Sequence, residues 1–171
     1  MGNKMVRNKS QITILYVSLV IYTALLMFFC TKSSPLYITN DWPDANAYFT
    51  MGKGMMNGAV PYKDLFDHKG PLLYLIYGIG YLIDNTGFFG VFLFQVASMS
   101  LVVIFSFKIA ELYTKSSKSS AVIALFVPVM ILAGGQYING ADLGGGSPDE
   151  FAAPLIVMSL YFAIRLFKDK K

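Results

Sequence analysis

The sequence predicts an all-α, polytopic integral membrane protein with about four transmembrane helices, and three observations lead to that prediction. Of the 171 residues, 55% are hydrophobic and only 14% are charged, whereas soluble domains carry about 25% charged residues. The mean hydropathy is +0.53. Four mostly apolar stretches approach the roughly 20 residues that a helix needs to cross a bilayer. They lie at residues 10–31, 86–107, 119–138 and 151–167, within a single membrane domain.

The first stretch has the basic start of a secretory signal peptide but a longer apolar core. Lys4, Arg7 and Lys9 precede it, and its core is longer than the roughly 7–15 residues of a signal peptide's apolar region. No small-residue cleavage site follows. We therefore expect a retained signal-anchor helix.

Two shorter helices are expected in the long loop over residues 32–84. The first, over residues 44–57, has Asp41 as its expected N-cap and Pro43 in its first turn, both typical of a helix start. The second, over residues 71–83, is apolar but has only 13 residues, which favours an interfacial position over a span. A second loop is expected over residues 139–150.

The distribution of charge predicts the orientation of the helices. With four spans, the side that carries both termini has ten Lys and Arg residues against two acids, and the other side has four Lys against eight acids. Basic residues concentrate on the cytoplasmic side of membrane proteins. We therefore expect a multi-pass protein of the cell membrane, with both termini cytoplasmic and both acidic loops outside.

Composition also argues against several classes of function. The basic residues form no single patch, so the net charge of +4 does not indicate nucleic-acid binding. Cys30 is the only cysteine and His68 the only histidine, which excludes a disulfide framework and makes a zinc site unfavourable. No glycine-rich phosphate loop is present.

Three polar groups in the expected outer loops could support chemistry. Asp41 and Asp44 stand close to Tyr48, and a carboxylate near the membrane surface can act as a general base; the alternative is that both acids cap a helix. His68 and Lys69 precede the apolar segment at residue 71. The lysine could hold a lipid-linked phosphate, or it could be an ordinary headgroup anchor.

The third group is Asp149 and Glu150, at the start of the last span. Paired acids there could bind a divalent cation, an amine or a sugar hydroxyl. The alternative is a helix start with Ser147 as N-cap and Pro148 at the first helical position, which acids in the first turn would stabilise.

These three groups together resemble the outer loops of the GT-C glycosyltransferases of the family 39 type, which include protein O-mannosyltransferases. Asp44 and Tyr48 match the spacing of the family's catalytic acid and tyrosine, and the segment 68–72 matches its His-Pro-Pro-Leu element. The segment 146–151 is similar to its second outer loop. The chain differs in having Ala45 where the family has Glu and Gly70 where it has Pro. It matches only the N-terminal part of those longer enzymes.

The resemblance implies a truncated N-terminal portion of an inverting glycosyltransferase. A polyprenyl-phosphate sugar in the membrane would be the donor, and an envelope polymer such as teichoic acid, or a protein, would be the acceptor. Asp44 would be the catalytic base, and Lys69 with His68 would stabilise the leaving phosphate. Asp41, Tyr48, Asp149 and Glu150 would bind substrate, with a divalent metal as one option and no certain cofactor.

A different class of function also fits the residues. The chain could be a non-enzymatic membrane scaffold, or a transporter-associated subunit whose outer acids bind cations. A second polypeptide that completes an enzyme is a further expected partner, because four spans are few to enclose both a donor lipid and an acceptor.

Overall fold

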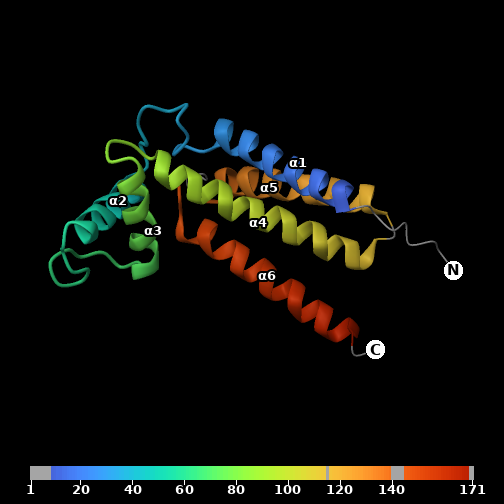
Figure 1. The fold of residues 1–171 in the computed structure, drawn as a ribbon. Helices are drawn as coiled ribbons and strands as arrows, with labels where there is room; N and C mark the ends of the chain where they lie inside the picture. The colour runs from blue at the N-terminus through green and yellow to red at the C-terminus, as the bar shows by residue number, and fades with distance from the viewer. Residues whose placement is uncertain (1–8, 115, 140–144, 170–171) are drawn as a thin grey trace.

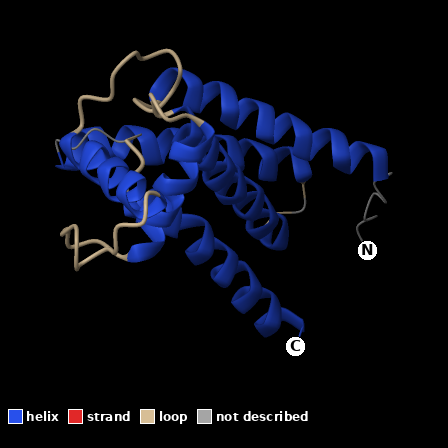
Figure 2. Cartoon of the chain, turned by 60° about the vertical axis from the view of Figure 1, so that its left-hand side comes forward, coloured by secondary structure: helices blue, strands red, loops and turns tan. Residues whose placement is uncertain are grey.

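A computed structural model describes residues 9–114, 116–139 and 145–169. Its regular structure is six helices, arranged as in Figures 1 and 2, and no strand is found in the described residues. The helical fold class is therefore confirmed. The helices are α1 (Lys9–Cys30), α2 (Pro43–Met56), α3 (Pro71–Ile83), α4 (Phe89–Tyr113), α5 (Ser117–Asn139) and α6 (Pro148–Asp169).

Three helices in the described part of the chain are long and apolar enough to cross a membrane: α1, α4 and α6. The fourth expected span, over residues 119–138, falls in α5, whose described apolar part is the shorter Ser117–Ala133. The helix α3 is also apolar, but it has only 13 residues. Three candidate spans are thus identified by length and composition within the described residues.

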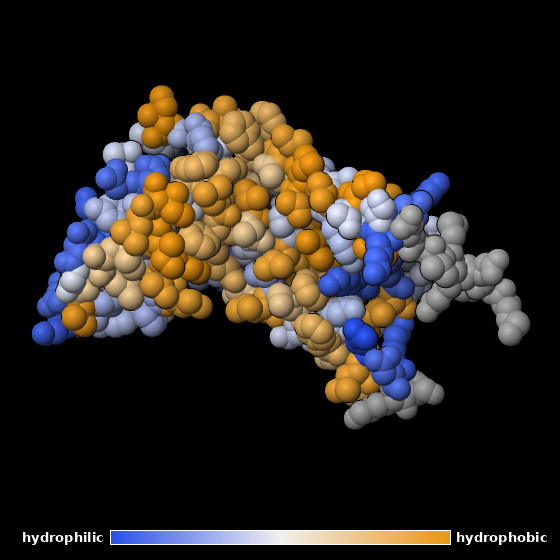
Figure 3. All heavy atoms as spheres, viewed as in Figure 1, coloured by the Kyte–Doolittle hydropathy of each residue, from blue (hydrophilic) through white to orange (hydrophobic). Residues whose placement is uncertain are grey.

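The helix α4 lies at the centre of the bundle and packs against α1, α3, α5 and α6. Within its most apolar window 56% of the residues are buried, against 17% in α1 and 11% in α6. The outer helices leave much of their apolar surface exposed, and Figure 3 shows this surface lying between two more hydrophilic ends of the molecule. An apolar belt between polar ends is what a bilayer would cover.

The helices α2 and α3 form one end of the molecule, away from both termini (Figure 1). They approach backbone to backbone at Gly52, where an added Cβ would lie 2.5 Å from the Gly78 nitrogen. A second close approach joins Gly80 of α3 to Gly90 of α4. Because these positions lack side chains, α3 fits closely between α2 and the start of α4.

Hydrophilic residues gather at both ends of the molecule rather than along its apolar middle (Figure 3). Several residues used for the predicted orientation lie outside the described part of the chain. These are Lys4, Arg7, Lys115, Asp142, Lys170 and Lys171.

Candidate functional site

The start of α2 differs from the prediction at its first residue. Trp42, not Asp41, occupies the N-cap position, with Pro43 following it. The backbone turns there because the Trp42 amide donates to Asn40 Oδ1 at 3.1 Å. Asp41 instead pairs with Lys32, whose Nζ lies 2.5 Å from Asp41 Oδ1, and this hydrogen bond lowers the pKa of the Asp41 carboxyl. The N-cap prediction for Asp41 is therefore wrong.

Asp44 lies exposed in the first turn of α2, beside a buried tyrosine. The Tyr48 hydroxyl donates to Asp44 Oδ2 at 3.4 Å, while the Tyr48 side chain is only 2% exposed. The rings of Trp42 and Tyr77 meet the Tyr48 ring edge-on, at centroid distances of 5.9 and 5.6 Å. Aromatic packing thus fixes the phenol, and the phenol fixes one face of the carboxylate.

Three carboxylates from three parts of the chain act on the Tyr48 hydroxyl. Burial and the negative charges of Asp44, Asp67 and Asp149 raise the pKa of Tyr48 to about 12. Asp44 begins α2, Asp67 precedes α3 and Asp149 begins α6. The fold therefore gathers segments more than 100 residues apart in sequence around one phenol.

Tyr77 connects α3 to the segment before α6. Its hydroxyl is 3.0 Å from the Gly145 oxygen and 2.9 Å from the Gly146 oxygen, and its side chain is fully buried. Burial is the first cause that raises the pKa of this phenol, followed by the nearby charge of Glu150. Gly145 packs against the Trp42 ring so closely that a Cβ would overlap it. The segment before α6 thus packs directly against the aromatic cluster of Trp42, Tyr48 and Tyr77.

The Glu150 side chain caps the start of α6. Its Oε1 accepts from the amides of Gly146 and Ser147, and its own amide donates to Ser147 Oγ, which is a reciprocal capping box. Its other oxygen, Oε2, accepts from the buried Gln95 side chain of α4 at 2.6 Å. The capping alternative holds for Glu150, whereas Asp149 is exposed.

The Asp67–Lys69 segment is held by tyrosines. The Lys69 amide donates to the Tyr74 hydroxyl at 2.9 Å, and the Tyr62 hydroxyl donates to the Lys69 oxygen at 2.5 Å. His68 is exposed, with Nδ1 3.0 Å from Asp67 Oδ1. Burial is the first cause that raises the pKa of the Tyr74 phenol, followed by the nearby Asp67 carboxylate.

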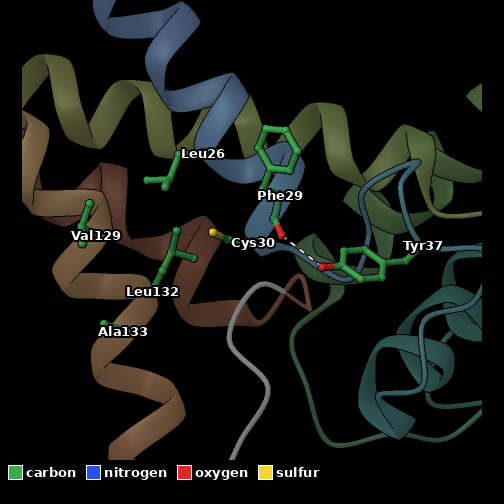
Figure 4. Close-up of a pocket in the computed structure, with 7 residues that line it drawn as sticks. All are labelled: Leu26, Phe29, Cys30, Tyr37, Val129, Leu132 and Ala133. Carbon is green, nitrogen blue, oxygen red and sulfur yellow. Dashed lines mark hydrogen bonds between the residues drawn. The ribbon is translucent and has the colours of Figure 1, made fainter.

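No group of three potential ligands in the described residues could hold a metal ion. A separate cavity of about 360 Å³ lies between α1 and α5, and none of the predicted site residues lines it. Figure 4 shows its apolar walls and, at its rim, the Tyr37 hydroxyl donating to the Phe29 oxygen. The acidic site and this cavity are therefore separate features.

The structure brings together some predicted site residues and not others. Asp44, Tyr48 and Asp149 belong to one electrostatic cluster, while Asp41 is engaged by Lys32 and Glu150 by Gln95. Sequence reasoning missed Asp67 and Tyr77 as members of this cluster. A usable signal was the spacing of Tyr74, Tyr77 and Tyr81, which places three phenols on one side of an otherwise apolar helix.

Comparison with known proteins identifies the family. Residues 5–171 match the family described as the Competence-induced Ccs4 N-terminal domain. No curated protein and no solved structure matches the chain.

This match corrects the resemblance to the GT-C glycosyltransferases, which is wrong as a family assignment. The three short segments that suggested this resemblance each form the start of a helix. Asp44 lies in a helix's first turn, Pro71 begins α3, and Glu150 caps α6. Acids and prolines are common at helix starts in unrelated proteins, so such short matches carry little family information. The match covers nearly the whole sequence, and the chain belongs to the Competence-induced Ccs4 N-terminal domain family.

Proposed function

We propose that the protein is a membrane transferase that moves a sugar from a polyprenyl-phosphate carrier to an acceptor hydroxyl in the cell envelope. The observation that supports this most is the exposed Asp44 carboxylate, hydrogen-bonded to the buried Tyr48 phenol at one polar end of an apolar helix bundle. A positioned, solvent-accessible carboxylate is suited to accept a proton from a hydroxyl. The family description names competence induction and no activity, so the proposal depends on the site.

The proposed step is a single displacement with inversion at the anomeric carbon. The acceptor oxygen attacks that carbon while Asp44 takes the hydroxyl proton. The bond from the anomeric carbon to the phosphate oxygen breaks, and the electron pair leaves with the polyprenyl phosphate. The increase in negative charge on the phosphate requires a nearby cation, a role that we assign to Lys69, with His68 beside it.

Two other acids would bind the substrates rather than take part in proton transfer. Asp67 and Asp149 lie close enough to affect the same phenol as Asp44. Carboxylates accept hydrogen bonds from sugar hydroxyls, so these two are suited to orient the sugar or the acceptor. Aromatic rings such as the partly buried Trp42 offer an apolar face for a sugar ring.

The proposal includes a membrane topology. The end formed by α2 and α3 faces outward, both termini are cytoplasmic, and α5 is a fourth span beside α1, α4 and α6. The acidic character of the loops at residues 32–84 and 145–150 supports this orientation. Further membrane segments, on this protein or on a second polypeptide, would complete the enclosure of the donor and the acceptor.

The test is an assay of sugar transfer in membranes that contain the full protein and radiolabelled polyprenyl-phosphate sugars. Asp44→Asn should abolish transfer, and Asp64→Asn is the matched control. Asp64 is an exposed acid of the same loop whose turn contact, from the Val60 amide at 2.8 Å, an asparagine oxygen can retain. Equal activity of the two variants would overturn the role of Asp44. Absence of transfer with every sugar lipid would favour the non-enzymatic scaffold.

A further inference from the structure

The other end of the bundle contains a lysine held among aromatic rings. Lys108 lies in the last third of α4 and is half-buried. Its Nζ is 4.5 Å from the centroid of the Phe105 ring, 5.8 Å from that of Tyr161 in α6 and 6.0 Å from that of Tyr16 in α1. Three helices therefore meet around one ammonium group.

The Lys108 ammonium has no acid as an ion-pair partner in the part of the chain that the structure describes. The acid one turn further along α4, Glu111, accepts a hydrogen bond from Ser117. Cation–π contacts hold an ammonium by its attraction to the ring faces, and because the rings carry no net charge they do not neutralise it. The positive charge therefore stays available to an anion from outside the protein.

A second cation lies on the same side of α4. Lys168 of α6 donates to the Leu112 oxygen and stands 4.0 Å over the Tyr113 ring. Leu112 follows Lys108 by four residues, which is one helical turn or about 6 Å along the axis. The two ammonium groups thus lie along the same seam between α4 and α6, with that of Lys108 over Phe105 and Tyr161 and that of Lys168 nearer the end of α4.

Three tyrosines near this seam indicate the depth at which it would lie in a bilayer. Tyr16 lies in the N-terminal half of α1, Tyr113 ends α4, and Tyr161 lies in the C-terminal half of α6, so all three lie toward the end of the bundle that carries both termini. Figure 3 shows the apolar belt giving way to hydrophilic residues at that end. Tyrosines gather at the level of the lipid headgroups. Lysines at that level meet the phosphates of the lipids, and anionic lipids most strongly.

We propose that the α4–α6 seam at the terminal end of the bundle is a binding site for the phosphate of an anionic phospholipid headgroup, with Lys108 as its fixed cation and Lys168 as its second. The site is separate from the acidic cluster beside α2. The bound lipid is structural, and no reaction takes place at this site.

The experiment counts bound lipid on the purified full protein by native mass spectrometry after extraction from vesicles of equal phosphatidylglycerol and phosphatidylcholine. Lys108→Met keeps the length of the side chain and removes the charge, and it should lower phosphatidylglycerol retention by about fivefold. Lys108→Arg should retain the lipid, because it keeps both the charge and the ring contacts. Lys118→Met is the matched control, since Lys118 is an exposed lysine at the same end.

Three results would overturn the proposal. One is equal retention by the Lys108→Met and Lys118→Met variants, and another is equal retention of the two lipids by the unmodified protein. The third is displacement of the lipid by soluble glycerol phosphate, which would identify the ligand as a free phosphate. If Lys108→Met does not fold, Tyr161→Leu replaces it. That variant removes one ring from the ammonium and should also weaken retention of phosphatidylglycerol.

Discussion

The Tyr48 hydroxyl donates to Asp44 Oδ2 at 3.4 Å, across one turn of α2. The phenol is buried and the carboxylate is exposed, so the pair joins the aromatic interior to the polar end of the molecule. A tyrosine with a pKa raised to about 12 stays protonated at any physiological pH and remains a hydrogen-bond donor. One oxygen of Asp44 thereby has a long contact with the phenol, while the carboxylate stays open to solvent.

The raised pKa of Tyr48 predicts a loss of stability at high pH. The native phenol keeps its proton up to about pH 12, whereas an unfolded tyrosine loses it near its ordinary value of 10.0. Between these values the unfolded state binds fewer protons, so the free energy of unfolding falls as the pH rises. Denaturant unfolding at pH 9, 10 and 11 measures this, and Tyr48→Phe should show a smaller decline.

Removing the neighbouring charges should lower the pKa of Tyr48. The carboxylates of Asp67 and Asp149 disfavour the phenolate. Asp67→Asn with Asp149→Asn should therefore shift the ultraviolet titration of Tyr48 to lower pH, together with that of Tyr74, whose pKa Asp67 also raises. Asp64→Asn should shift neither. A titration curve unchanged by the double substitution would mean that these acids lie too far from the phenol to act on it.

Tyr77→Phe should destabilise the protein without changing its helical content. The substitution leaves the buried Gly145 and Gly146 oxygens without the hydroxyl that contacts them, and an unsatisfied buried polar group costs about 1–3 kcal/mol. Tyr37→Phe is the control, because Tyr37 also donates to a backbone oxygen but is 45% exposed. Unfolding in detergent would measure both, and equal losses would contradict the buried role of Tyr77.

Gly52→Ala should separate α2 from α3. The added Cβ would lie 2.5 Å from the Gly78 nitrogen and 2.8 Å from the Tyr74 oxygen, and backbone atoms cannot move aside cheaply. We expect a cost of about 1–3 kcal/mol from overpacking. Gly70→Ala meets nothing within 4 Å and should be nearly neutral. A similar unfolding midpoint for both variants would show that the two helices are not packed this closely.

Cysteine labelling in intact cells tests the proposed orientation. Gly145, in the second outer loop, is unsuitable as a site for the introduced cysteine, because a side chain there would overlap the Trp42 ring. Asp64→Cys and Ser119→Cys are both exposed, at opposite ends of the bundle, and Cys30→Ser removes the native thiol. An impermeant reagent should label position 64 and spare position 119. The reverse pattern would place the acidic cluster in the cytoplasm and remove the outer-face proposal.

The contacts of Glu150 show which interactions the local sequence predicts and which it does not. Ser147 and Glu150 stand at the spacing of a capping box, and the structure contains the expected hydrogen bonds. The bond from Gln95 to Glu150 joins residues 55 apart, and nothing in the spacing indicated it. By contrast, Asp41 had the same local signal for an N-cap, but Lys32 competes for its carboxylate.

The sequence by itself determined that the chain is helical, with long apolar helices separated by polar loops. Those properties depend on runs of neighbouring residues, as the near agreement of the expected segment 44–57 with α2 (Pro43–Met56) illustrates. Only the tertiary structure decided which acids share a site. Asp67 and Asp149 act with Asp44 on the Tyr48 phenol because the close approach at Gly52 joins α3 to α2 and the Tyr77 hydroxyl joins α3 to the segment before α6. Such contacts depend on residues distant in sequence, and local patterns do not encode them.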